Sequence, residues 1–119
     1  MEPLEYDIEF PRGNTCPVSF NLTDDNGEPL NPSPTTEIYF TLKDIYSKTP
    51  YVLQKRLSTG GITLVDGVCS FTLDHNDTSN LKYGKNYDYS IDIKDVNLFR
   101  TLIIGNLTLT ENSTHLANE

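Results

Sequence analysis

Tryptophan is absent from this chain of 119 residues, and methionine, histidine and cysteine are scarce, with one, two and two copies. Two cysteines, Cys16 and Cys69, are too few for a disulfide framework. A single bridge between neighbouring strands and two free thiols both remain open, and a reducing cytosol favours the free thiols. Cysteines this far apart, without paired histidines, do not indicate a zinc site.

Basic residues are also few: nine stand against 17 acidic residues, which gives a net charge of −8. The lysines and arginines are scattered singly, and an acidic surface without a basic patch is repelled by nucleic acid and by anionic membranes. The longest apolar run, Leu102–Ile104, is far too short to span a bilayer. The acidic start, Met1–Glu5, lacks the apolar stretch of a signal peptide. We therefore expect no nucleic-acid or membrane partner and synthesis in a cytoplasm.

The dominant pattern is an alternation of apolar and polar residues, which places one face of a strand in a core and the other in water. Such alternation is typical of antiparallel sheets. It predicts an all-β fold in a single domain, residues 1–119, with flexible ends at residues 1–5 and 111–119. The alternating segments are residues 6–10, 18–23, 38–43, 69–74, 87–94 and 106–110.

Turn-forming residues separate these segments. Asp25–Gly27 and Asp66–Gly67 are typical of tight turns, and the second predicts a hairpin. Asp95–Asn97 is expected to join two strands. Two prolines in Asn31–Pro34 exclude a central strand there. About eight strands result, spaced as in a β-sandwich.

One short helical turn is expected near residues 77–83, with Asp77 as its N-cap and Gly84 closing it. Tyr87 follows, and we expect its ring to be buried and its hydroxyl to reach back to the turn. This arrangement resembles the corner between strands E and F of immunoglobulin-like sandwiches. The sequence therefore predicts an immunoglobulin-like antiparallel β-sandwich.

No set of residues indicates catalysis. His75 is the one candidate centre for a small enzyme, but the chain lacks a nucleophile-elbow spacing, and an exposed loop histidine is the simpler interpretation. Asp24–Glu28 is rich in oxygen ligands, yet it lacks the spacing of a calcium loop and is interpreted as a turn. Gly60-Gly61 precedes a strand rather than a helix, so it forms no phosphate loop. We expect a non-enzyme without cofactor, metal or small-molecule substrate.

Tyrosines are the best candidates for a binding surface, because a tyrosine ring buries much area at low entropic cost and keeps a polar tip. Four of them are candidates for exposed rings at a protein interface: Tyr39, Tyr46, Tyr51 and Tyr83. Exposed rings can also stack on sugars. Some of the four are equally explained as edge-strand residues with high β-propensity.

The order of several segments resembles a family of structural proteins of tailed-bacteriophage virions, best known from the N-terminal domain of the baseplate upper protein. These segments are Phe10–Thr15, Val18–Phe20, Asp25–Leu30, Glu37–Lys43, Asp77–Thr78, Leu81–Ile91 and Arg100–Leu107.

The resemblance implies an immunoglobulin-like sandwich that mounts other virion proteins in the baseplate, tail, neck or capsid exterior. It implies localisation in the virion after synthesis in the bacterial host cytoplasm, and assembly as a homo-oligomer or symmetric array. A carbohydrate- or receptor-binding module of a phage or bacterial surface is the alternative.

Overall fold

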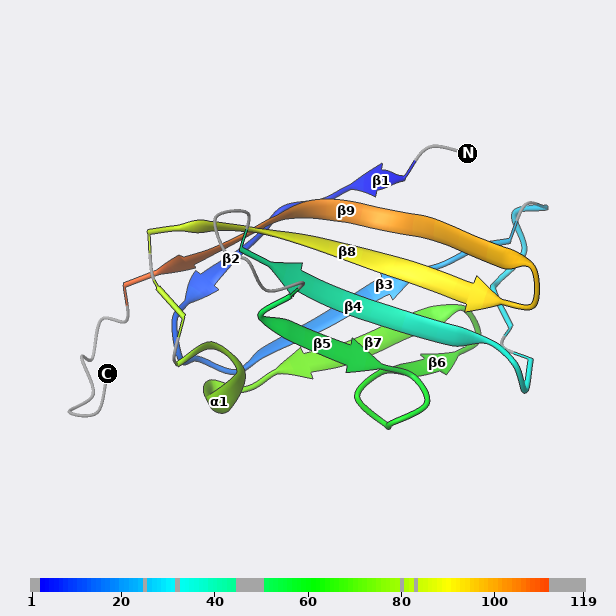
Figure 1. Cartoon of the computed structure of the whole chain (residues 1–119), viewed down its shortest axis with the longest axis horizontal. Coiled ribbons are helices and arrows are strands. Elements are labelled where there is room, and N and C mark those ends of the chain that lie inside the picture. Colours follow the sequence, from blue (N-terminus) through cyan, green and yellow to red (C-terminus); the bar gives the residue numbers. More distant parts are fainter. Residues whose placement is uncertain are drawn as a thin grey trace.

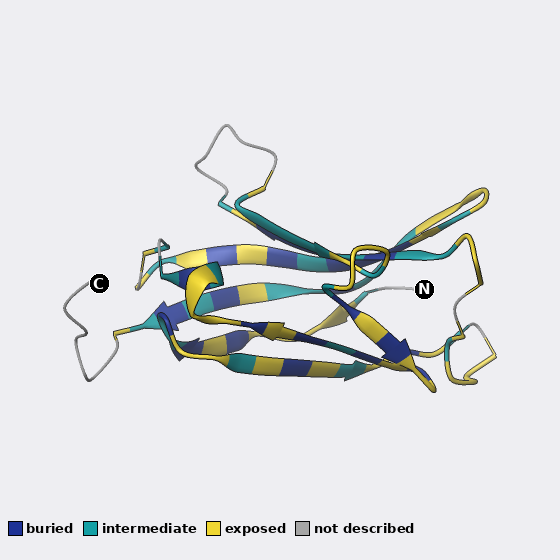
Figure 2. Ribbon diagram, turned by 90° about the horizontal axis from the view of Figure 1, so that it is seen from below, coloured by how far each residue is buried: buried dark blue, intermediate teal, exposed yellow. Residues whose placement is uncertain are grey.

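Two β-sheets face each other across one apolar core (Figures 1 and 2). The computed structural model describes residues 3–24, 26–31, 33–44, 51–79, 81–82 and 84–111. Within these residues the elements are β1 (Leu4–Glu5), β2 (Ile8–Pro11), β3 (Cys16–Asn21), β4 (Glu37–Lys43), β5 (Leu53–Arg56), β6 (Thr63–Val65), β7 (Val68–Leu73), α1 (His75–Thr78), β8 (Asn86–Asp95) and β9 (Leu98–Thr110).

The strand order confirms the predicted sandwich. The larger sheet has the order β1-β9-β8-β4-β5, with β2 also paired to β9, and the smaller sheet has the order β3-β7-β6. These orders correspond to the GFCC′ and BED sheets of immunoglobulin-like domains. The expected count was about eight strands, and the described residues form nine, because the first alternating segment is preceded by a separate short strand, β1. Both β1 and β2 pair with β9 in parallel, whereas every other strand pair is antiparallel.

The N-terminal segment that was expected to be flexible contains a short strand. Leu4 and Glu5, from the expected N-terminal end, pair with Ile103 and Ile104 as strand β1. Both of these N-terminal side chains are exposed, so backbone pairing rather than side-chain burial places them. Residues 1–2 and 112–119 lie outside the described residues.

The core consists of the inward-facing residues of both sheets. Phe40 of β4 and Phe71 of β7 meet across the sandwich with ring centroids 4.6 Å apart, and Phe40 also contacts Tyr89 at 5.7 Å. Aromatic pairs at such distances add to the free energy gained by burying their area. The buried apolar residues are Ile8, Phe10, Val18, Leu22, Ile38, Phe40, Leu42, Ile62, Leu64, Cys69, Phe71, Leu73, Tyr87, Tyr89, Ile91, Ile93, Ile103, Leu107 and Leu109.

Strand β9 unites two segments that looked separate in the sequence. Ile91 of β8 pairs with Ile103, but the next residue, Asp92, pairs with Thr101, so the register shifts at Leu102. This bulge explains why Leu102–Ile104 is continuously apolar: an extra residue interrupts the alternation between the two faces.

Two of the predicted turns have the expected backbone. Asp66 and Gly67 both have positive φ, 51° and 80°, and join β6 to β7 as the predicted hairpin. Asn97, with φ of 59°, closes the connection from β8 to β9. Asparagine, aspartate and glycine adopt this left-handed conformation more readily than other residues.

The predicted turn at Asp25–Gly27 is organised by its neighbour. The Asp24 carboxylate accepts hydrogen bonds from the backbone N–H groups of Asn26, at 2.9 Å, and Glu28, at 3.1 Å. The oxygen-rich segment thus serves its own backbone, as the turn interpretation requires. Asp25 itself lies outside the described residues.

The helix is displaced from its predicted position. It spans His75–Thr78 rather than residues 77–83, and Asp74 rather than Asp77 is its N-cap, so that prediction was wrong. The Asp77 N–H donates to the Asp74 carboxylate at 3.0 Å, and the Asp74 N–H donates to the Asp77 carboxylate at 2.9 Å. A capping box joins the N-cap residue to the residue three positions later, and the two aspartates at this spacing place the start of the helix at Asp74.

The predicted tyrosine corner is confirmed. The Tyr87 ring is 3% exposed, and its hydroxyl accepts a hydrogen bond of 2.9 Å from the backbone N–H of Lys82. Gly84 joins the same corner, because its N–H donates to the Leu109 carbonyl of β9 at 2.7 Å. The corner therefore joins the approach to β8 to the end of β9.

We predict that Tyr87→Phe lowers the free energy of unfolding by about 1 kcal/mol, because the Lys82 N–H loses its acceptor in a partly buried place. Urea unfolding followed by circular dichroism measures the change. Tyr39→Phe is the matched control, because the Tyr39 ring mainly provides a face for the Arg56 guanidinium at 5.2 Å. Equal effects of the two substitutions would show that the corner hydrogen bond adds nothing.

The cysteines are two free thiols. They lie on neighbouring strands of the smaller sheet, but Cys69 pairs with Phe20 and Cys16 pairs with Leu73, so they sit at opposite ends of the pairing. Burial raises the pKa of Cys69 to about 11. The Cys69 thiol therefore stays protonated and unreactive at neutral pH.

Candidate functional site

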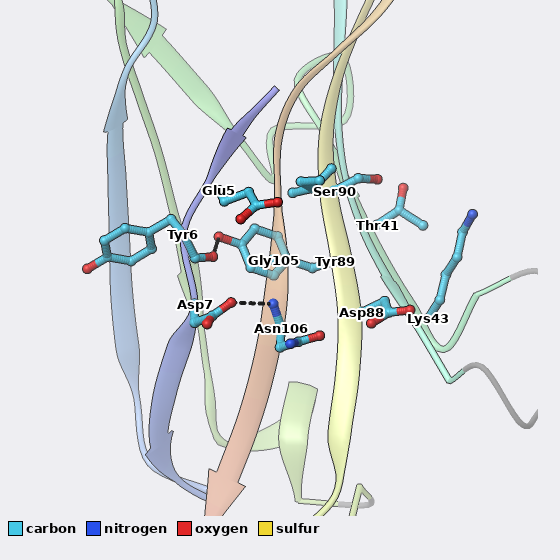
Figure 3. A pocket seen from close by; sticks show the side chains of 11 residues that line it. Glu5, Tyr6, Asp7, Thr41, Lys43, Asp88, Tyr89, Ser90, Gly105 and Asn106 are labelled. Carbon is cyan, nitrogen blue, oxygen red and sulfur yellow. Dashed lines mark hydrogen bonds between the residues drawn. The ribbon is translucent and has the colours of Figure 1, made fainter. Parts of the chain in front are cut away.

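An open depression of about 700 Å³ lies on the larger sheet, where the N-terminal strand runs beside β9 (Figure 3). Its walls come from residues of β4, β8 and β9 and from the junction of β1 and β2. The lining residues are Glu5, Tyr6, Asp7, Thr41, Lys43, Asp88, Tyr89, Ser90, Ile104, Gly105 and Asn106.

The depression forms because the N-terminal strand is interrupted between β1 and β2. Two side chains take over the hydrogen bonding at the interruption: the Tyr89 hydroxyl donates to the Tyr6 carbonyl, and the Asp7 carboxylate accepts from the Asn106 N–H at 3.0 Å (Figure 3). The Tyr6 carbonyl and the Asn106 N–H are thus paired although the strand ladder is broken between β1 and β2.

Gly105 allows the Tyr6 backbone to approach β9 closely. A Cβ atom at this position would overlap the Tyr6 carbonyl and would lie 2.9 Å from the Tyr89 ring. Tyr89 is the direct cross-strand partner of Gly105, so its ring covers the space that a side chain would otherwise fill. A glycine is required here for the close approach of another strand.

The electrostatics of the depression are acidic. Glu5, Asp7 and Asp88 line it, against one cation, Lys43. Burial, together with the charge of Asp7, raises the pKa of Tyr89 to about 12, which keeps its hydroxyl protonated and donating. The arrangement suits a cationic or hydrogen-bond-donating group of a partner. Across the described part of the chain, no three His, Cys, Asp or Glu side chains gather closely enough to hold a metal ion.

Two of the four tyrosines of the predicted surface, Tyr39 and Tyr51, lie among the described residues. Tyr39 lies in the middle of β4, half-buried against Arg56, and Tyr51 precedes β5 and is 43% exposed. The register, with Tyr39 opposite Arg56 and Leu42 opposite Leu53, places the two rings near opposite ends of the β4–β5 pair. Tyr46 and Tyr83 lie outside the described residues, so the four tyrosines remain a predicted interface.

His75 has a structural contact. It is the first residue of α1, and its Nδ1 lies 2.9 Å from the Gly13 carbonyl. The Gly13 N–H donates to the buried Thr78 hydroxyl at 3.0 Å, and an Arg12 guanidinium N–H donates to the Leu81 carbonyl at 3.3 Å. The helix therefore anchors the turn between β2 and β3.

A second candidate surface, which the sequence reasoning missed, is the tip of the β8–β9 hairpin. Val96, Leu98 and Phe99 are 71%, 43% and 66% exposed, and the hairpin turn lies at one extreme end of the molecule (Figure 1). The available signal was the apolar character of residues flanking the Asp95–Asn97 turn, a place where polar residues are usual.

The hairpin tip is fastened at its base by Asp95. Its carboxylate accepts hydrogen bonds from three hydroxyls of the loop that precedes β4: Ser33 at 3.0 Å, Thr36 at 2.8 Å, and Thr35. The Thr35 and Thr36 bonds and the Val96 N–H, with a smaller contribution from Ser33, lower the pKa of Asp95 to about 2. The carboxylate thus holds the loop against the start of the hairpin turn.

No family model matches the chain, and no curated protein matches it. No helix among the residues that the structure describes has the length and apolar character needed to cross a bilayer.

We predict that Gly105→Ala lowers the free energy of unfolding by about 1–3 kcal/mol, the usual cost of inserting atoms into a filled space. The added methyl group must displace the Tyr6 carbonyl, so β1 should detach from β9. Urea unfolding gives the stability, and amide exchange at Tyr6, whose N–H donates to the Ile104 carbonyl, reports the detachment. Asn106→Ala adds no atom between Tyr6 and β9, so its free energy of unfolding is expected to stay within about 0.5 kcal/mol of the parent. Unchanged stability and exchange in Gly105→Ala would contradict the close approach.

We predict a pH-dependent contribution from Asp95. Its pKa in the folded state, about 2, is below the unfolded value of about 3.9. The stabilisation is therefore complete above about pH 4 and is lost as the pH falls towards about 2. Asp95→Asn should abolish this part of the acid dependence of the urea midpoint. Asp66→Asn, at the other hairpin, is the control and should keep it. Parallel pH profiles of Asp95→Asn and the parent would contradict the clamp.

Proposed function

We propose that this protein is a non-enzymatic structural component of a bacteriophage virion and acts through protein–protein contacts. The observation that carries the proposal is the apolar hairpin tip formed by Val96, Leu98 and Phe99. The order of segments shared with tailed-phage structural proteins supports the virion part of the proposal. The β-sandwich supplies a rigid mount for such a contact.

The hairpin tip has the composition of an interface centre. An exposed phenylalanine flanked by valine and leucine offers area that a partner can remove from water, and aromatic residues are enriched at such centres. Asp95 and its three hydroxyl donors hold the base of the hairpin, so less flexibility is lost on binding. The tip is therefore a preorganised anchor.

Repetition suits this kind of contact. A single hairpin tip buries too little surface for a tight complex, because specific interfaces remove about 1,200–2,000 Å² from water. Copies arranged by particle symmetry add weak contacts into a stable assembly. The charge of −8 per copy favours solubility before assembly.

Electron microscopy of purified phage particles tests the proposal. Density for this fold at symmetry-related positions, with the β8–β9 tip against another virion protein, is the expected result. Presence of the chain in infected cells but never in particles would refute it.

We predict that Phe99→Ser lowers incorporation into particles at least about tenfold, equivalent to about 1.4 kcal/mol, and leaves the free energy of unfolding within about 0.5 kcal/mol of the parent. Quantitative mass spectrometry of purified particles measures incorporation. Val65→Ser is the matched control, because Val65 is 65% exposed at the β6–β7 hairpin. Equal losses for both variants would count against a specific anchor at Phe99.

A carbohydrate- or receptor-binding role is the second candidate. Tyr6 and Tyr51 are 55% and 43% exposed, and exposed tyrosine rings can stack on sugars. A glycan array decides between the roles: a specific hit that is lost in Tyr6→Ala or Tyr51→Ala favours this second candidate, and an array without hits removes it.

A further inference from the structure

The free edges of the two sheets differ in how they resist pairing with another chain. Exposed edges are usually protected by charge, shortness, proline or interruption. Strand β5 carries Lys55 and Arg56, and β6 has three residues. The β1–β2 edge is interrupted at Tyr6 and Asp7. Strand β3 has six residues and no charge, so Pro17 is its one protective feature.

The backbone of β3 presents hydrogen-bonding groups outward. The Leu22 N–H donates to the Gly67 carbonyl, next to the β7 side of the sheet. Because backbone groups alternate in direction along a strand, the residues at odd positions point to the free edge. Pro17 fits this phase, since proline occurs on edges with its nitrogen outward. The N–H groups of Ser19 and Asn21 therefore face away from β7.

A groove of about 420 Å³ runs beside this edge, between β3 and the junction of β1 and β2. Its apolar part includes Ile8, Val18 and Phe20, and the Tyr6 ring stands edge-on to Phe20 with centroids 5.5 Å apart. Figure 3 shows this ring turned from the depression towards the neighbouring sheet. The groove exists because the N-terminal strand pairs with β9 instead of β3.

The groove also has a charge. Asp7 and Glu9 belong to its lining, which contains no lysine or arginine. An added strand places alternate side chains in the groove and the others on the outer face of the smaller sheet. Apolar groove-facing side chains would contact Val18 and Phe20. A cationic one would meet Glu9, since the Asp7 carboxylate is directed to the Asn106 N–H.

We propose that the free edge of β3 binds an extended segment of another protein by β-strand addition, with apolar and cationic side chains facing the groove. Main-chain hydrogen bonds to Ser19 and Asn21 supply affinity, and the groove selects the side chains. The proposal rests on the protein-binding function proposed above but uses a surface other than the hairpin tip.

Charge decides against a second copy of this chain as the occupant. Each copy carries −8, and symmetric pairing of two β3 strands brings the acids beside both grooves towards each other. Like charges brought together at an interface disfavour the wrong partner. Pro17 reduces self-pairing further, because each copy lacks one edge N–H.

The test uses the full chain and a capped peptide, Thr-Val-Thr-Lys-Thr-Val-Thr, in which valine and lysine share one face. NMR titration is expected to shift the Ser19 and Asn21 amides and to slow their hydrogen exchange at least about tenfold at saturation. Replacing the peptide lysine by glutamate should weaken binding, and added salt should reduce the difference between the two peptides.

Ser19→Pro removes an edge N–H without removing a bond to β7, and should weaken binding at least about tenfold. Ser19→Ala is the matched control: both variants lose the Ser19 hydroxyl, which lies 3.1 Å from the Ser70 hydroxyl, but the alanine variant keeps the N–H. Should Ser19→Pro fail to fold, a peptide N-methylated on its pairing edge tests the same bonds. Glu9→Gln should weaken lysine-peptide binding, and Asp66→Asn should leave it unchanged.

Several results would overturn the proposal. They are the absence of binding at millimolar peptide, amide protection at β5 instead of Ser19 and Asn21, or equal affinity for the lysine and glutamate peptides. A dimer in sedimentation experiments that Ser19→Pro dissociates would make a second copy the occupant and refute the basic partner. Phe99→Ser is expected to bind the peptide normally, so failure of the hairpin function and failure of the β3 edge are separable.

Discussion

The parallel pairing of the N-terminal strand with β9 determines the form of the rest of the molecule. It depends on a close approach that Gly105 allows and that the Tyr89 hydroxyl and the Asp7 carboxylate complete with hydrogen bonds. The pairing extends the larger sheet by β1 and β2, and at the same time leaves β3 without a neighbour on one side. The depression on the larger sheet and the groove beside β3 both result because the N-terminal strand pairs with β9 and not with β3.

The alternating pattern predicted the sheets well because each exchange of apolar and polar residues has a direct physical meaning: one face is buried and the other is wet. Tyr87 was also predictable, since a tyrosine after a short turn and a glycine has a recurring role at this corner. The Asp66-Gly67 hairpin was predictable because few residue pairs adopt positive φ at both positions. These features are set by residues near one another in the sequence.

Features that depend on distant residues were not predictable in the same way. One local feature was also missed: the capping acid was assigned to Asp77, but the reciprocal pair of bonds selects Asp74, three positions earlier. The role of Gly105 depends on Tyr6, about a hundred positions away, so the local sequence shows only a glycine inside a strand. The exposure of a side chain also depends on residues of other strands. Tyr39 was expected to have an exposed ring, but Arg56 of the next strand partly covers it.

The two surfaces proposed for protein contacts differ in the type of binding that they support. In the proposed contacts, a hairpin tip with Phe99 would enter a pocket of its partner, whereas the β3 edge would receive a strand. Charge disfavours self-pairing of the β3 edge, so this edge favours a heterologous contact over a two-fold symmetric one. Heterologous contacts form rings or extended arrays when they repeat. In this proposal, a small sandwich with two such surfaces would link different neighbours within a symmetric particle, and the free edge of β3 would give it the second connection.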